Sequence, residues 1–307
     1  MIARRAVLAL ALAGAGGCSG PPPASPAAPA PAPGATPAPA TAPAPSTQHP
    51  VGSDPESAWR AVEPVVLEAP PWDYRLVDDV GRRAVVVPRL LRLMEAPNTI
   101  TDQEAWLRRN DFGAPGTAAP SRFVPDFYGG EPRMRVMEQH GLTLAIYGAG
   151  SDGRYLLVAG DASRRAFDFQ HYLTPSAGPP GSDGWPQGLL WAAVASRWLY
   201  VANAHYTYAA TTGGLNGYIT ALDLETGELR WRSRPRVANA RTFAVVDDAL
   251  VAGYGFTAEP DALFVIDRFT GLVLDELPVR TAPEWILRRD DRLFVRAYDA
   301  DYVFTLR

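Results

Sequence analysis

Short apolar strands separated by polar turns recur along the second half of the chain. One strand pattern occurs four times, as YLLVAG (155–160), WLYVANA (198–204), ALVAGYG (249–255) and RLFVRAY (292–298). With Leu157, Leu199, Leu250 and Leu293 taken as equivalent, successive copies are 42, 51 and 43 residues apart. A second apolar strand follows each copy, as RAFDFQ (165–170), YITALDL (218–224), LFVIDRF (263–269) and YVFTLR (302–307). This period predicts an all-β domain built from repeated four-stranded propeller blades.

One of these repeats continues into a turn with a distinctive residue spacing. In GYITALDLETGELRW (217–231) the motif residues are Ala221, Asp223, Thr226, Gly227 and Trp231, and Asp267, Thr270 and Gly271 repeat part of it. The aspartate can accept hydrogen bonds from the turn's N–H groups, and the glycine can adopt a positive φ. The tryptophan is large enough to fill the gap between two blades. The next repeat has Asp275 in place of the tryptophan, and the repeat that contains Asp168 lacks the Thr-Gly turn.

This spacing resembles the repeat of the pyrroloquinoline-quinone (PQQ) dehydrogenases and of their non-catalytic relatives, over roughly residues 134–307. The resemblance implies a β-propeller of four-stranded antiparallel blades. The dehydrogenases of this family are larger, hold calcium-bound quinone at the propeller axis and often have two adjacent cysteines beside it. This chain has a single cysteine, so none of those cofactor residues can be assigned and no cofactor is predicted. The family also contains envelope lipoproteins of the barrel-assembly type, which bind protein partners without a cofactor.

The number of blades depends on how the propeller closes. The fourth repeat ends at Arg307 after its third strand. Propellers commonly complete the last blade with an N-terminal strand, which removes an exposed edge. RRAVVVP (82–88) or WDYRLV (72–77) is predicted to do this, and residues 90–133 would then form an irregular additional blade. About five blades are therefore expected, with an incomplete, open propeller as the alternative, and a capping box of Thr101 and Glu104 predicts a short helix.

The N-terminal end predicts export and lipidation. Arg4 and Arg5 precede an apolar run (6–13) that is too short to span a bilayer, and small residues then lead into Cys18. A lipoprotein signal peptide (1–18) with lipidation at Cys18 is predicted, and an ordinary secretory signal is the alternative. Residues 19–50 are expected to be a disordered tether, because 12 prolines and 10 alanines occupy positions 21–50. By resemblance to Gram-negative lipoproteins, the non-acidic Ser19 favours the outer membrane.

Composition excludes several classes of function for the remaining domain (51–307). The net charge is −4 and the chain has no basic run, so no nucleic-acid partner is expected. The chain contains no lysine, which excludes Schiff-base chemistry and phosphate binding by a P-loop. The four histidines lack metal-ligand spacing, and the acidic pairs fall in predicted turns. No catalytic residue and no metal site are predicted.

Two loops are longer in one repeat than in the others. They are YLTPSAGPPGSDGWPQ (172–187) and HYTYAATTGGLNG (205–217), and the antiparallel strand order places both at the same end of a propeller. Extended loops on a rigid scaffold often carry binding sites, although a tolerated insertion is the alternative. The candidate binding residues in these loops are Tyr172, Trp185, His205, Tyr206, Tyr208 and Asn216.

These features together predict a lipid-anchored, non-catalytic propeller scaffold of the bacterial cell envelope. Its loops are expected to bind envelope proteins or a small ligand, and its lipid anchor is expected to bind the membrane. The alternative is an enzyme, either a reduced quinoprotein-type dehydrogenase or a propeller hydrolase. Convergent carboxylates or a bound metal at the propeller axis would favour the enzyme.

Overall fold

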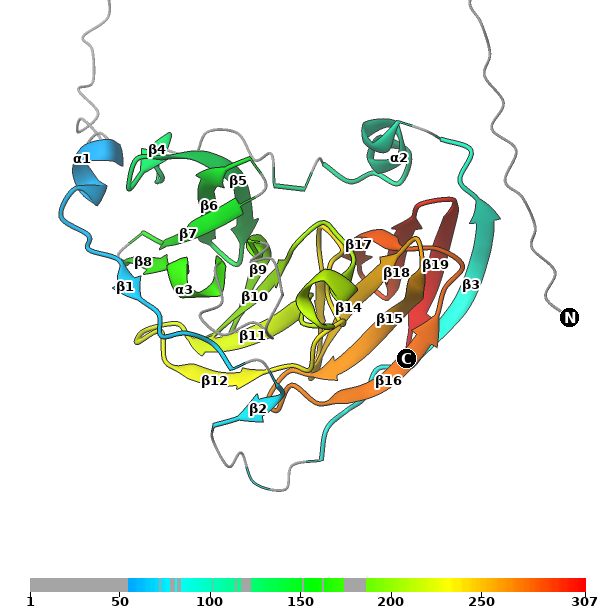
Figure 1. The fold of residues 1–307 in the computed structure, drawn as a ribbon. Coiled ribbons are helices and arrows are strands. Elements are labelled where there is room, and N and C mark those ends of the chain that lie inside the picture. Colours follow the sequence, from blue (N-terminus) through cyan, green and yellow to red (C-terminus); the bar gives the residue numbers. More distant parts are fainter. Residues whose placement is uncertain are drawn as a thin grey trace, which may run out of the picture. The chain divides into compact units, whose positions relative to one another are not determined.

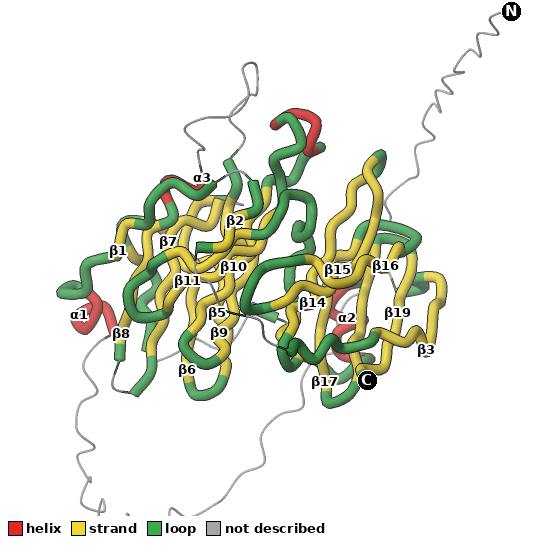
Figure 2. The backbone as a smooth tube through the Cα atoms, turned by 90° about the horizontal axis from the view of Figure 1, so that it is seen from below, coloured by secondary structure: helices red, strands yellow, loops and turns green. Residues whose placement is uncertain are grey.

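A computed structural model describes residues 55–71, 73–77, 81, 84–100, 102–113, 115–116, 123–150, 152–161, 163–173 and 186–307. All of them belong to the compact unit Val51–Arg307. They form four sheets with few helices (Figures 1 and 2). In this part of the chain, no helix is both long enough and apolar enough to cross a membrane. The predicted signal peptide, Cys18 and the tether lie outside the described residues.

Sheet 1 has six strands in the order β1-β8-β7-β6-β5-β4. The strands are β1 (Val65–Val66), β4 (Phe127–Tyr128), β5 (Glu131–Gln139), β6 (Leu142–Ala149), β7 (Asp152–Ala159) and β8 (Arg164–Asp168). Neighbouring strands are antiparallel, except that β1 pairs with β8 in parallel. Residues on β6 and β7 are buried almost continuously, as expected for strands covered on both faces.

Sheets 2, 3 and 4 follow in chain order. Sheet 2 is β2-β12-β11-β10-β9, with β2 (Arg75–Leu76), β9 (Gly188–Ala195), β10 (Trp198–Ala204), β11 (Tyr218–Asp223) and β12 (Leu229–Arg232). Sheet 3 is β13-β14-β15-β16, with β13 (Ala244–Val246), β14 (Ala249–Phe256), β15 (Glu259–Asp267) and β16 (Val273–Pro278). Sheet 4 is β17-β18-β19-β3, with β3 (Leu90–Pro97), β17 (Pro283–Arg289), β18 (Arg292–Ala297) and β19 (Ala300–Leu306).

The repeated strands of the sequence are therefore the central strands of four blades. The four first copies fall in β7, β10, β14 and β18, and the second copies fall in β8, β11, β15 and β19. One apolar cluster joins sheets 1, 2 and 3 through residues such as Leu156, Tyr200 and Phe264. Another cluster joins sheets 3 and 4 through residues such as Val251 and Val295. Sheets 2 and 3 bury both faces against neighbouring sheets, and sheets 1 and 4 each bury one face in this way, while other segments of the chain cover their second faces. This stacking of sheets confirms the all-β propeller prediction.

An N-terminal strap (residues 65–97) supplies strands at the outer ends of three sheets (Figure 1). It places β1 beside β8, β2 beside β12, and β3 beside β19. The last blade is completed by an N-terminal strand, as expected, but by β3 and not by residues 72–77 or 82–88. Within the first of those segments, β2 extends sheet 2 instead. In the pairing of β3 with β19, Leu91 lies opposite Thr305, so β3 is the strand that completes the blade.

The described residues form four blades, so the expectation of about five is wrong. The stretch 90–133 was expected to form an additional blade, but it contains β3, a helix and β4. Leu90–Pro97 is already used in sheet 4, and β4 pairs with β5 of sheet 1. Too little chain remains between them for another four-stranded sheet.

Helix α2 (Gln103–Arg109) lies on the connection from sheet 4 to sheet 1. Its N-cap is Asp102, whose side chain accepts a hydrogen bond from the Glu104 N–H at 2.9 Å, so the predicted cap at Thr101 is wrong. Thr101 itself lies outside the described residues. Trp106 and Leu107 of α2 pack on Trp285 of β17, which holds the helix against sheet 4. The remaining helical elements are α1 (Pro55–Trp59), α3 (Gln170–Leu173) and the 3-10 helix η1 (Ala209–Thr212).

Candidate functional site

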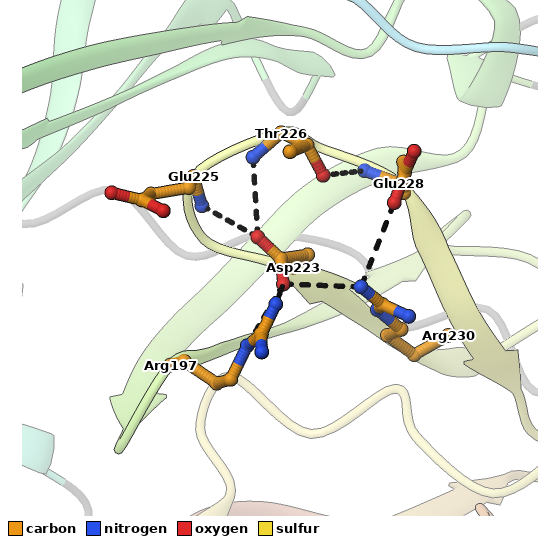
Figure 3. Close-up of polar contacts among 6 residues, drawn as sticks. All are labelled: Arg197, Asp223, Glu225, Thr226, Glu228 and Arg230. Atoms are coloured by element: carbon orange, nitrogen blue, oxygen red, sulfur yellow. Dashed lines mark hydrogen bonds and ion pairs between the residues drawn. The ribbon is translucent and has the colours of Figure 1, made fainter. Parts of the chain in front are cut away.

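The repeat motif forms the turn between β11 and β12 (Figure 3). The Asp223 carboxylate accepts hydrogen bonds from the backbone N–H groups of Glu225 at 2.9 Å and Thr226 at 3.2 Å. Arg197 and Arg230 donate to its other oxygen. Burial opposes the charged carboxylate, but these hydrogen bonds outweigh burial and lower the pKa of Asp223 to about 2. Both carboxylate oxygens of Asp223 therefore accept hydrogen bonds that hold the turn.

The turn after β15 repeats this arrangement and receives the tryptophan of the preceding blade. Asp267 accepts hydrogen bonds from the Phe269 N–H at 2.8 Å and the Thr270 hydroxyl at 2.9 Å. Trp231, opposite Ala221 in the sheet register, is fully buried, and its indole N–H donates to the Arg268 carbonyl at 3.0 Å. Gly271 has φ +76°, and a Cβ atom there would overlap the Trp231 ring.

At Gly227, the other motif glycine, the strap occupies the position that Trp231 occupies at Gly271. Gly227 has φ +75°, and a Cβ atom there would lie 3.0 Å from Leu67 and 3.1 Å from Val65. Both residues belong to the strap, which follows the outer edge of sheet 1. Because sheet 1 lacks an equivalent of Trp231, the N-terminal segment covers this turn. The motif residues therefore pack one blade on the next and do not form a reactive site.

Loop 205–217 is fixed by a buried polar network. Asn216 accepts a hydrogen bond from the His205 N–H at 2.9 Å and donates to the His205 carbonyl at 3.2 Å. The His205 ring Nε2 lies 3.0 Å from the Thr212 hydroxyl, and Glu259 accepts from the Ala209 N–H at 2.7 Å. Burial lowers the pKa of His205, which favours the neutral ring. His205 and Asn216 therefore position the loop and are not available to a partner.

The predicted binding residues do not form one patch. Tyr172 is buried against Phe169 at a ring-centroid distance of 5.0 Å and lines a cavity of about 360 Å³ beneath the strap. Tyr206 and Tyr208 are 49% and 37% exposed, and Tyr206 lines a different cavity. Trp185 lies outside the described residues. Only the two tyrosines of loop 205–217 are accessible among the described candidates.

The cavity beside Tyr206 lies next to α2 and to one outer or near-outer strand of each sheet, namely β5, β9, β13 and β17. We call it the inner cavity. It has two lobes of about 420 and 310 Å³ that share Met134, Arg135, Gly150 and Arg241. The first lobe is completed by Gln103, Glu104, Leu107, Pro115, Gly116 and Trp285, and the second by Leu189, Leu190 and Tyr206. Volumes of this size are typical of small-molecule sites.

Two arginines dominate the electrostatics of the inner cavity. Arg135 lies on β5 and is half-buried, whereas Arg241 precedes β13 and is exposed. Burial lowers the pKa of Arg135, the Tyr206 phenol raises it, and the charge of Arg241 lowers it. Arg241 also lies over the Trp285 ring, with its guanidinium carbon 5.6 Å from the ring centroid. Among the described residues, no group of three His, Cys, Asp or Glu side chains is placed to hold a metal ion.

Sequence reasoning missed Arg135, Arg241 and Trp285. They belong to three segments that lie far apart along the chain, and none of these segments has a motif. Only the fold brings them together, because each lies on or just before one of the strands β5, β13 and β17. A single arginine in an amphipathic strand such as MRVME carries no signal by itself.

No protein-family model matches this chain, and no curated protein matches it by sequence. Solved structures that match include BamB from Moraxella catarrhalis, at 11% identity and a TM-score of 0.28, over 56% of this chain and 69% of that one. The β-propeller domain of the Trilobed protease from Pyrococcus furiosus, which has an open velcro topology, matches at 10% identity and a TM-score of 0.35, over 56% of this chain and 54% of that one. The computationally designed Ika8 protein matches at 11% and 0.30, and this chain spans 58% of its length. At these scores the propeller assignment depends on this chain's own four sheets.

Proposed function

We propose that this protein is a lipid-anchored, non-catalytic β-propeller scaffold of the bacterial cell envelope, held at the outer membrane through Cys18. It binds an envelope partner through the surface formed by loop 205–217 and the rim of the inner cavity. The observation that carries this proposal is the pair of exposed tyrosines, Tyr206 and Tyr208, on a loop fixed by a buried hydrogen-bond network. Rigid, exposed aromatic side chains are typical anchors of protein interfaces.

Four titratable groups in loop 205–217 and in the repeat turns are committed to structural contacts, which supports a binding role over catalysis. His205 is held by the loop network, and Asp223 and Asp267 are held by their turns. Asp168 forms two hydrogen bonds with Arg154, at 2.9 and 2.7 Å. Groups that are committed to structural hydrogen bonds are poor candidates for proton transfer.

Affinity capture from envelope extracts tests the proposed surface. The full chain and the double variant Tyr206→Ala/Tyr208→Ala serve as baits. Tyr298→Ala is the matched control, because Tyr298 is 75% exposed and lies in a different sheet, on the turn between β18 and β19. We expect the double variant to lose a partner that the full chain and the control both retain. Identical partners for all three baits would contradict the proposed surface.

Two further measurements test the anchor and the non-catalytic role. The variant Cys18→Ala should lose palmitate labelling if Cys18 carries the lipid. Bound metal or quinone-dependent activity in the purified chain would contradict the non-catalytic role.

A further inference from the structure

Two cationic side chains share the inner cavity, and no anionic side chain in the described part of the chain pairs with them. Among the described residues, neither the Arg135 nor the Arg241 guanidinium forms a hydrogen bond or an ion pair with a carboxylate. Arg133, on the same strand, pairs with Asp126 at 2.7 Å. A half-buried arginine keeps its charge at neutral pH, so pairing is the usual way in which a protein compensates for its desolvation.

The acidic group on the cavity wall does not fill this role. Glu104 lines the first lobe, but its side chain is 72% exposed and lies 3.3 Å from Arg108. Its charge is thus directed to a cation of its own helix. The inner cavity therefore keeps an excess positive charge in its wall, which attracts anions from solution.

The stem of Arg135 and the backbone of Arg241 are held by their surroundings. Gly116, at φ +78°, lies so close to the Arg135 stem that a Cβ atom there would be 3.4 Å from its Cβ and Cγ. The Gly116 carbonyl also accepts a hydrogen bond from the Val136 N–H at 2.9 Å, which fixes this segment to β5. Arg241 is held by the Trp285 ring and by its own N–H, which donates to the Glu284 carbonyl at 2.8 Å. An arginine whose stem or backbone is already fixed loses less conformational entropy when its guanidinium group binds an oxyanion.

The remaining wall is largely apolar. Met134, Leu190 and Trp285 line the cavity, and Leu190 and Trp285 are 1% and 6% exposed. A wall of this kind favours a ligand that carries an apolar or aromatic body besides its anionic group. Tyr206 adds a phenolic hydroxyl on the second lobe.

We propose that Arg135 and Arg241 bind the phosphate or carboxylate group of a small organic anion, whose apolar body lies against Met134, Leu190 and Trp285. Two charge-assisted contacts fix the anionic group, and the combined volume of the two lobes accommodates the body. This inference specifies the ligand class of the inner cavity and rests on the proposed function only in taking that rim as a binding surface.

Calorimetric titration of the purified full chain at low ionic strength tests the inference. The probes are phenyl phosphate, benzoate, inorganic phosphate and the neutral benzyl alcohol. We expect saturable binding of phenyl phosphate or benzoate, weaker binding of inorganic phosphate, no binding of benzyl alcohol, and lower affinity at high salt. The comparison of phenyl phosphate with benzoate identifies which anionic group the two arginines prefer. No saturable binding of either aromatic anion, or equal affinity for inorganic phosphate, would overturn the proposal.

Three variants locate the site. Arg135→Gln and Arg241→Gln should each weaken binding at least tenfold, as expected for the loss of a charge-assisted hydrogen bond. The exposed Arg292 gives the matched control Arg292→Gln, which should bind as the unchanged chain does. Arg241 is exposed, so its variant remains informative even where Arg135→Gln unfolds the chain. Equal affinity in Arg241→Gln and Arg292→Gln would overturn the assignment.

The two proposals fail separately. Anion binding that persists while Tyr206→Ala/Tyr208→Ala captures the same partners as the unchanged chain contradicts the scaffold surface alone. Partner capture that persists while no probe binds contradicts the anion site alone.

Discussion

At the scale of single residues, three aspartates in successive repeats accept the same local hydrogen bond. One carboxylate oxygen of Asp168, Asp223 and Asp267 accepts a hydrogen bond from the N–H two residues later, at 2.9, 2.9 and 2.8 Å. This is the local geometry in which aspartate mimics a backbone turn. After Asp168, where the Thr-Gly pair is missing, the same hydrogen bond is made to the first residue of α3.

The charge of Asp223 should contribute to stability in a pH-dependent way. Its pKa of about 2 in the folded chain lies below the ordinary value of 3.8, so its contribution is fully present above pH 3.8 and is lost as the pH falls through 2. We expect Asp223→Asn to lower the free energy of unfolding by about 2 kcal/mol at pH 7, measured by urea denaturation. The difference from the unchanged chain should shrink between pH 4 and pH 2.

The exposed Asp275 provides the control for this prediction. Its carboxylate accepts only from the neighbouring Glu276 N–H at 2.9 Å among the described contacts, so Asp275→Asn should change stability little at any pH. A pH-independent effect of Asp223→Asn would contradict the role assigned to its charge.

At the scale of elements, adjacent blades are joined by an aromatic side chain that packs on a glycine turn. Trp231 of β12 in sheet 2 lies on Gly271 in the turn after β15 of sheet 3. The corresponding turn of sheet 2, at Gly227, is covered by Val65 and Leu67 of the strap. The strap is therefore a part of the blade packing and not a loose addition to it.

Gly271→Ala should destabilise the domain more than a positive φ alone would. The substitution adds the cost of a left-handed conformation, about 1–2 kcal/mol, to an overlap with the Trp231 ring. We expect a loss of about 3 kcal/mol or more in the free energy of unfolding. Gly130 has φ +84° and open space around its Cβ position, so Gly130→Ala should lose only the first contribution. Equal losses in the two variants would contradict the packing role of Gly271.

The sequence predicted the elements that have a local signal. The central strands of the four blades combine apolar residues with a repeated turn, and they lie where the period placed them. The pairing of the three strap strands was not predicted correctly. The segments β1 and β2 have two residues each, and β3 reads LLRLMEAP with no alternation of apolar and polar positions. Their pairing depends on contacts with strands far away in the chain, which local patterns do not encode.

The candidate site was predictable only in part, for a related reason. The loop length identified Tyr206 and Tyr208, but the polar residues of the same loop are buried in its own network. A histidine or an asparagine in a long loop has the same appearance in sequence whether it faces a partner or supports the loop. Arg135 and Arg241 become neighbours of one cavity only when the sheets assemble.

At the scale of the whole described unit, the chain that follows the strap forms one wall of the inner cavity. After β3 pairs with β19, the chain continues through α2, which packs on Trp285 and forms a wall of the cavity. The next segment then reaches β5 through Gly116. The central claim is therefore that β3 closes sheet 4 in the observed register.

Disulfide formation between paired strands tests this claim most directly. In a Cys18→Ala background, which removes the only native cysteine, Leu91→Cys and Thr305→Cys place two thiols at directly opposed positions of β3 and β19. Leu91→Cys with Leu274→Cys on β16 of sheet 3 serves as the mismatched pair. We expect rapid oxidation of the 91–305 pair to a native-like, cross-linked chain and none for the mismatched pair, measured by mass and by non-reducing electrophoresis. Failure of the 91–305 pair to cross-link, or equal cross-linking of both pairs, would contradict the completion of sheet 4 by β3.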